Sequence, residues 1–306
     1  MNTTPSFTHT LRQRWQAADS MLCVGLDPDP ARIPAHLGTG PEAIDRFCRD
    51  IIAATADTVC AFKPQIAYFA AQGAEDVLAG LIAHIHAEHP GIPIILDAKR
   101  GDIGSTARQY GVEAFDRFKA DALTLSPFMG FDSIEPYFEW AGRGLILLCR
   151  TSNPGGNDLQ ALSVLPAGDT TGTPPGAQSP RQSASDAASS AQPEKLYEHL
   201  ARLAAGPWNV NGELGLVVGA TFPDELARVR ALAPRLPLLV PGVGAQGGDV
   251  NATVRAGLDA DGYGLVINSS RAILYAGKGT DFADQARQAA VATRDAIRAA
   301  RDAARA

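Results

Sequence analysis

The sequence predicts an α/β fold of the (β/α)8 class, a TIM barrel, in a single domain spanning residues 1–306. Three observations carry this prediction. Eight short apolar segments recur along the chain, most are separated by segments with helical spacing, and the apolar runs are continuous, as in strands buried on both faces of a parallel sheet. An open doubly wound sheet is the alternative. We prefer the barrel because the glycine fingerprint of dinucleotide-binding sheets is missing after the first apolar run, where GLDPDP stands.

The elements alternate along the chain. The candidate strands cover residues 21–27, 59–63, 92–99, 121–126, 144–152, 214–221, 236–244 and 264–271. Candidate helices cover 41–57, 70–89, 105–118, 194–205 and 281–306. In the first helix, Ile44, Phe47 and Ile51 recur with the spacing of one helical face. In a barrel of this class, polar residues at the carboxyl ends of the strands are the functional candidates.

One segment interrupts this alternation. Residues 166–193 contain no aromatic residue and no Leu, Ile or Val. Such a composition buries too little apolar surface to offset the entropy of ordering. We expect a flexible surface insertion between the fifth strand and its helix, because the strand–helix alternation resumes at once afterwards.

Composition excludes several classes of protein. The chain has 306 residues, 45% of them hydrophobic, and a net charge of −6, which argues against general nucleic-acid binding but leaves a small anionic substrate possible. None of the four cysteines forms a C-x-x-C pair, so we expect reduced, buried thiols. The polar N-terminus has no apolar signal core, and no apolar run approaches the roughly 20 residues of a membrane span. A cytoplasmic protein with no membrane partner is expected.

Charged residues stand where the first three apolar runs end: Asp27, Lys63, and Asp97 with Lys99. For any one of them, a surface charge or a structural salt bridge is the better explanation. Their occurrence on consecutive strand ends favours a shared cluster, because strand ends of a barrel converge on one mouth. Asp97 and Lys99 are two residues apart, so extended geometry predicts that they point the same way. Such mutually perturbing charges are candidates for catalysis.

A phosphate site is predicted at the far end of the same mouth. The glycine-rich turn PGVGAQGGD follows the seventh strand, and Arg271 follows the eighth. Backbone N–H groups of such a turn, with an arginine, suit a phosphate, and this barrel class often binds phosphate there. A tight turn beside a solvated arginine is the alternative. No His/carboxylate cluster has the spacing of metal ligands, so no metal is expected.

These motifs together resemble one family. The pattern D-x-K-x-x-D-I-x-x-T in DAKRGDIGST, the turn PGVGAQGGD and the arginine after the eighth strand resemble orotidine 5′-phosphate decarboxylase. GLDPDP, FKPQ, TSNPGG and VVGAT are similar to its longer bacterial branch. The resemblance covers the chain except for the insertion and the last helix. It implies decarboxylation of orotidine 5′-phosphate to uridine 5′-phosphate, the last step of de novo pyrimidine synthesis, without metal or organic cofactor.

The resemblance also implies catalytic roles. Lys99 matches the lysine that protonates C6 of the pyrimidine after carbon dioxide leaves, and Asp97 matches the carboxylate beside the substrate carboxylate. Lys63 matches the lysine that bridges the ribose and that aspartate. Asp102 and Thr106 match residues contributed across a homodimer interface to the neighbouring site.

Substrate-binding roles follow in the same way. Asp27 matches a ribose contact, and Ser152 matches a serine that hydrogen-bonds the pyrimidine. Gln246 and Arg271 match the phosphate-binding pair, with Gly244 in the glycine-rich turn.

Two alternatives remain open from the sequence. One is a metal-dependent phosphosugar decarboxylase on the same barrel, such as the family acting on 3-keto-L-gulonate 6-phosphate. The other is a catalytically silent barrel that binds a phosphorylated metabolite. The retained lysine and aspartate cluster speaks against the second, because binding alone does not need it.

Overall fold

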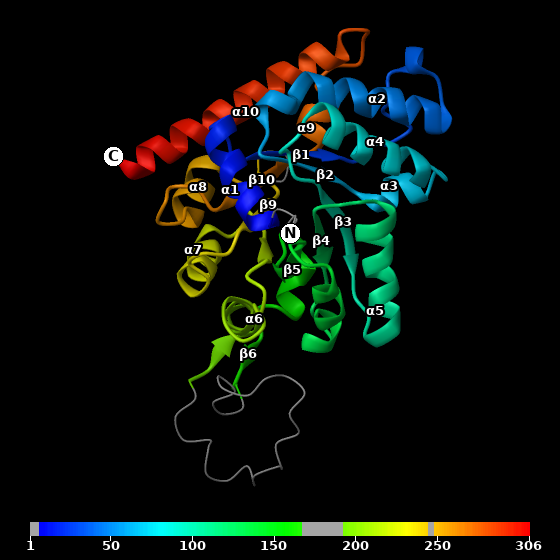
Figure 1. Ribbon diagram of the computed structural model, residues 1–306. Coiled ribbons are helices and arrows are strands. Elements are labelled where there is room, and N and C mark those ends of the chain that lie inside the picture. The colour runs from blue at the N-terminus through cyan, green and yellow to red at the C-terminus, as the bar shows by residue number, and fades with distance from the viewer. Residues whose placement is uncertain (1–5, 167–191, 244–247) are drawn as a thin grey trace.

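The computed structural model describes residues 6–166, 192–243 and 248–306 and contains a closed parallel barrel (Figure 1). Its strands are β1 (Leu22–Leu26), β2 (Ala61–Pro64), β3 (Ile95–Arg100), β4 (Ala122–Leu125), β5 (Gly144–Arg150), β8 (Leu214–Val218), β9 (Leu238–Pro241) and β10 (Leu265–Ser269). They lie in the order β2-β1-β10-β9-β8-β5-β4-β3, and every neighbouring pair is parallel. Single bridges from Phe62 to Ile94 and from Gln65 to Asp97 join β2 to β3. All eight predicted strands are confirmed.

The barrel is surrounded by helices. They are α1 (Phe7–Ala18), α2 (Gly40–Thr55), α3 (Ile66–Ala70), α4 (Glu75–Glu88), α5 (Gly104–Gly111), α6 (Leu196–Ala205), α7 (Pro223–Leu232), α8 (Val250–Gly257), α9 (Arg271–Leu274) and α10 (Phe282–Arg305). In Figure 1 the long α10, in red, runs beside α2. Charged side chains of α10 form ion pairs with other parts of the chain: Arg287 pairs with Asp57, and Arg298 and Arg301 pair with Asp19.

Two helices differ from their predicted form, and one strand connection has no helix. The predicted helix at 70–89 is interrupted at Gly73, whose φ of 58° places it in the left-handed region that glycine tolerates, and α4 begins only at Glu75. The helix at 105–118 is α5 continued by a wider π-helical turn at Val112–Arg117. Between β4 and β5 only short 3-10 turns occur, at Phe131–Ser133 and Glu135–Glu139.

The predicted insertion at 166–193 falls almost wholly outside the described residues. The segments on either side of it form a small antiparallel ladder, in which β6 (Ser163–Val164) pairs with β7 (Glu194–Lys195). The chain therefore leaves and re-enters the fold at one point, next to α6 (Figure 1).

Helix α1 was not predicted, and it covers the amino-terminal end of the barrel. Its inner face is fully buried through Phe7, Leu11 and Trp15, which follow the four-residue spacing of one helical face. Ser6 caps its first turn by accepting a hydrogen bond from the backbone of His9. The periodicity and the cap are both visible in the sequence, so this helix could have been predicted.

The contacts of α1 reach the chain just before several strands. They join Phe7 N to Gly142 O (2.8 Å), Arg14 Nε to Val59 O (2.9 Å), Thr8 N to Glu213 Oε2 (2.9 Å) and Arg12 Nη2 to Arg235 O (3.3 Å). These partners precede β5, β2, β8 and β9, so α1 bridges strand starts that lie around the barrel. This end is sealed, which leaves the carboxyl ends of the strands as the open mouth.

The interior contains the predicted thiols. All four cysteines are free and buried, which confirms the expectation. No helix in the described part of the chain combines the length and hydropathy needed to span a membrane.

The seal at the amino-terminal end can be tested through Phe7. An added Cβ at Gly144 would lie 2.2 Å from the Phe7 ring, so this side chain fills its site closely. We expect Phe7→Ala to reduce the free energy of unfolding by about 3–5 kcal/mol, because a buried aromatic side chain is lost and a cavity remains. Urea-denaturation midpoints measure this. The control Val210→Ala, at a residue 63% exposed, should change stability by less than about 0.5 kcal/mol; equal effects would contradict the seal.

Candidate active site

Three of the predicted residues form one hydrogen-bonded cluster at the open mouth. Lys63, on β2, donates from Nζ to Asp97 Oδ2 at 2.8 Å. Lys99, on β3, donates from Nζ to Asp97 Oδ1 at 2.6 Å. Each oxygen of one carboxylate is therefore held by a different ammonium group, as the convergence of strand ends predicted.

Burial and charge act in opposite directions on this cluster. Burial by itself would raise the pKa of Asp97 and lower that of Lys63. For Asp97 the attraction of Lys63 and Lys99 is stronger, and its pKa lies well below the ordinary value. For Lys63 the attraction of Asp97 and Asp27 is stronger, and its pKa lies well above the ordinary value. Both groups therefore stay charged over the whole physiological range.

The backbone at Lys99 departs from an extended strand. Its φ is 47°, in the left-handed region, and the β3–β4 register shifts between Leu96 and Arg100. The two side chains do meet, as predicted, but the reason given for it was wrong, because the strand is not regularly extended between Asp97 and Lys99. Such a conformation is unfavourable for a residue with a Cβ and persists only where the surroundings hold it.

Thr124 supplies part of that support and was missed by the sequence analysis. Its hydroxyl donates to Asp97 Oδ1 at 2.9 Å and accepts hydrogen bonds from the backbone N–H groups of Ala98 and Lys99, at 3.0 Å each. In the sequence, Thr124 is an uncharged polar residue within the largely apolar run DALTLS. Nothing in that run indicates that its hydroxyl binds Asp97 and the β3 backbone.

Two adjoining cavities open beside the cluster, and Lys63 and Asp97 line both of them. The larger, of about 500 Å³, is also lined by Lys99 and Ser152. The smaller, of about 180 Å³, is lined by Asp27 and Arg271. Asp27 Oδ1 is buried and has no hydrogen-bond partner among the residues that the structure describes, so it is available to a ligand hydroxyl. Six predicted residues thus surround one continuous site.

Two of the other four predicted residues, Asp102 and Thr106, are not brought into this group. Asp102 accepts a hydrogen bond from the adjacent N–H of Ile103, Thr106 is exposed, and neither residue lines the two cavities. Gly244 and Gln246 lie outside the described residues. In the part of the chain that is described, no group of three or more His, Cys, Asp and Glu side chains is arranged to hold a metal ion.

A buried arginine holds the loop that carries Ser152. Arg150, at the end of β5, is 1% exposed, donates to Glu225 and Asn157, and lies 4.2 Å from the Phe222 ring centroid. Gln160 accepts from the backbone of Thr151 at 2.8 Å and so fixes the start of the loop. Arg150 follows directly on an apolar run, like Asp27 and Lys63, and that signal could have identified it.

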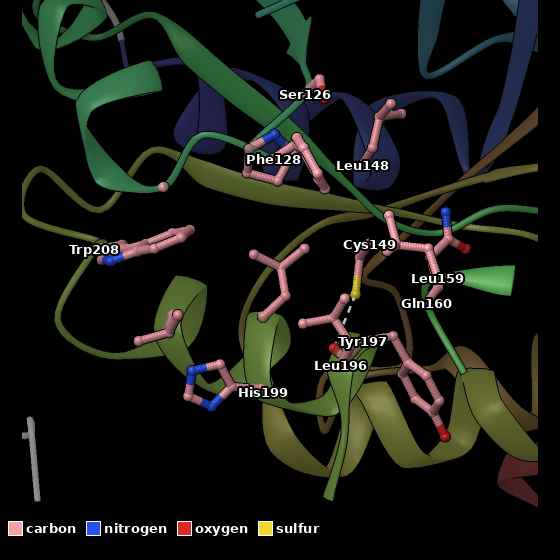
Figure 2. Close-up of a pocket in the computed structure, with 14 residues that line it drawn as sticks. Ser126, Phe128, Leu148, Cys149, Leu159, Gln160, Leu196, Tyr197, His199 and Trp208 are labelled. Carbon is pink, nitrogen blue, oxygen red and sulfur yellow. Dashed lines mark hydrogen bonds between the residues drawn. The ribbon is translucent and has the colours of Figure 1, made fainter. Parts of the chain in front are cut away.

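A third cavity, of about 390 Å³, lies between the β4 and β5 ends and α6 (Figure 2). Its lining is mostly apolar, and Figure 2 shows Phe128 and Trp208 along its edge and the Cys149 thiol donating to Tyr197 O. None of the predicted site residues that the structure describes lines it. It shares Leu148, Leu159 and Gln160 with the larger site cavity, so these three residues form the wall between the two.

The coupling of Asp97 to the lysines predicts a pH effect on stability. The pKa of Asp97 is lower in the folded than in the unfolded chain, so its contribution is complete above about pH 4 and is lost as the pH falls below that value. Asp97→Asn lacks this contribution. We therefore expect the wild type to lose more stability than Asp97→Asn between about pH 5 and pH 3, measured as urea midpoints. Parallel losses in the two proteins would show that Asp97 is not stabilised in its charged form.

Sequence comparison with known proteins indicates the same family as the residues of the site. A profile of the orotidine 5′-phosphate decarboxylase / HUMPS family matches residues 20–172. An orotidine 5′-phosphate decarboxylase from Azoarcus sp. (strain BH72) is 62% identical, over 96% of this chain and 99% of that protein. One from Dechloromonas aromatica (strain RCB) is 60% identical, over 95% and 98%.

Solved structures show the same similarity. The OMP decarboxylase of Leishmania donovani superimposes with a TM-score of 0.76 at 40% identity, covering 97% of this chain and 99% of that one. A putative orotidine-monophosphate decarboxylase from Toxoplasma gondii gives a TM-score of 0.80 at 34% identity, covering 98% and 97%. Near full-length identity of this order, together with the lysine–aspartate cluster at the mouth of the barrel, places the chain in the orotidine 5′-phosphate decarboxylase / HUMPS family.

Proposed function

We propose that this protein is a carboxy-lyase that converts orotidine 5′-phosphate into uridine 5′-phosphate and carbon dioxide, in pyrimidine biosynthesis. The observation that carries the proposal is the Lys63–Asp97–Lys99 cluster in a chain whose relatives, 56–62% identical, are named orotidine 5′-phosphate decarboxylases. The cluster holds a permanently ionised carboxylate next to an ammonium group that faces a cavity of substrate size.

In the proposed reaction, the bond between C6 and the carboxylate carbon breaks, and its electron pair stays on C6 while carbon dioxide leaves. The ring delocalises this charge poorly, so a fixed positive charge nearby lowers the barrier. The Lys99 ammonium supplies that charge and then transfers one proton from Nζ to C6. The resulting amine takes a proton from solvent. Asp97 lies near the departing carboxylate and holds the Lys99 ammonium in place until the transfer.

The two adjoining cavities support an extended binding mode. We assign Ser152 to the pyrimidine, and Asp27 and Lys63 to the ribose, since these line the cavities on either side of Asp97.

We assign Arg271, with Gly244 and Gln246 of the glycine-rich turn, to the phosphate. Arginine and backbone N–H groups suit a phosphate. Binding energy from this remote group can accelerate decarboxylation only where it is realised in the transition state, for example by holding the site closed over the reacting carbon.

We further propose a cytoplasmic homodimer with shared active sites. Asp102 and Thr106 stand apart from the cluster of their own chain, and Ile103 between them is 48% exposed. An exposed apolar residue flanked by family-motif residues suits a surface that a second copy covers. In this arrangement Asp102 and Thr106 complete the partner's site.

The activity is tested by following the ultraviolet absorbance of orotidine 5′-phosphate with and without a chelator. We expect turnover that the chelator leaves unchanged, whereas loss of turnover would favour the metal-dependent phosphosugar alternative.

We expect Lys99→Ala to lower kcat by at least about a hundredfold, since the proton donor is lost. Lys119→Ala is a matched control, because Lys119 also has a left-handed backbone, with φ of 57°, and lies at the opposite end of the barrel. Near-normal activity of Lys99→Ala would refute its assigned role.

Shared sites predict recovery of activity on mixing two weakened variants. A hybrid of a Lys99→Ala chain and an Asp102→Ala chain has one site with both changes and one site with neither. Random re-association makes half of the dimers hybrids, so the mixture should regain about a quarter of wild-type activity. Activity is measured after joint unfolding and refolding, with each variant refolded alone as control. No gain in the mixture would show that Asp102 serves its own chain.

A further inference from the structure

Every hydrogen-bonding position of the Thr124 hydroxyl is used. This residue, at the centre of β4, is 1% exposed, and its Oγ1 contacts the backbone N–H groups of Ala98 and Lys99 and the carboxylate of Asp97. A hydroxyl has two lone pairs and one proton. Since two N–H groups occupy the lone pairs, the proton has only the carboxylate left to bind. The direction of this hydrogen bond is therefore fixed by the backbone.

The hydroxyl also compensates for the irregularity of β3. Leu96 pairs with Leu123, and the next paired residues are Arg100 and Leu125, so three residues of β3 lie opposite Thr124 alone. Within this irregular stretch, the N–H groups of Ala98 and Lys99 point to the Thr124 side chain instead of to a backbone carbonyl of β4. Thr124 accepts both hydrogen bonds and so supports the left-handed conformation of Lys99.

We propose that Thr124 is a positioning residue for the decarboxylation, an inference that rests on the function proposed above. One hydroxyl joins the Asp97 carboxylate to the backbone of Lys99 and makes them a single rigid unit. β4 therefore fixes where the Lys99 side chain starts relative to its counter-ion, Asp97. Thr124 lines neither site cavity, so it acts through Asp97 and Lys99 and not by touching the substrate.

The test compares variants with and without this hydroxyl. Thr124→Val keeps the shape and removes the hydroxyl, whereas Thr124→Ser keeps the hydroxyl. Thr58→Val is the matched control, because Thr58 is also fully buried but its hydroxyl donates to Thr55 O before β2, at the sealed end. For each protein, kcat and KM for orotidine 5′-phosphate, the Kd of uridine 5′-phosphate and the melting temperature are measured.

We expect Thr124→Val to lower kcat roughly tenfold to a hundredfold, as displaced catalytic groups do, with little change in the Kd of uridine 5′-phosphate. Thr124→Ser should recover most of the lost kcat. Thr58→Val should lower the melting temperature without lowering kcat. Should Thr124→Val fail to fold, Thr124→Ala removes the same hydroxyl and is compared with Thr124→Ser.

Three results would overturn the inference: an unchanged kcat when the hydroxyl is lost, no recovery with serine, or an equal fall of kcat in Thr58→Val. A wild-type protein that does not decarboxylate orotidine 5′-phosphate would instead refute the proposed function, and this inference with it. Wild-type turnover therefore separates the two failures.

Discussion

The structure depends on the compensation of one buried negative charge by two positive ones. Asp97 has an ammonium on each oxygen, and without them a carboxylate at this depth would take up a proton. The compensation requires side chains from two strands to meet at a few ångströms, which a barrel provides because its strand ends converge. It also requires β3 to leave regular geometry at Lys99. The backbone is therefore strained at Lys99, the residue that carries one of the two positive charges.

The two ends of the barrel have different tasks. At the amino-terminal end, α1 fills the opening with Phe7, Leu11 and Trp15, and this packing contributes stability. At the other end, charged and polar groups line open cavities, and Asp27 keeps a buried oxygen unpaired among the described residues. An unpaired buried oxygen reduces stability but favours a ligand that satisfies it. The packing of α1 at the amino-terminal end thus offsets the stability lost to the polar groups at the open mouth.

The sequence identified the barrel and the charge cluster because both leave long-range signatures. Continuous apolar runs mark buried parallel strands, and charges that end such runs mark the mouth. It did not identify Thr124, because the partners of this side chain depend on the register between strands, which no local pattern encodes. The same reason explains Lys99: its side chain meets Asp97 as predicted, yet through a backbone conformation that a count of strand periodicity cannot foresee. No helix was predicted between β4 and β5, and only 3-10 turns occur there.

Helix α1 also constrains the order in which the chain can fold. Some contacts of this helix lie far along the chain: Trp15 stacks on Tyr263, and Asp19, its C-cap, pairs with Arg301, 282 residues later. At ribosomal elongation rates, these partners emerge on the order of tens of seconds after the helix itself. During that interval Trp15, on the apolar face of α1, lacks the Tyr263 ring on which it stacks. The seal formed by α1 can therefore be completed only after Tyr263 and Arg301 have been synthesised.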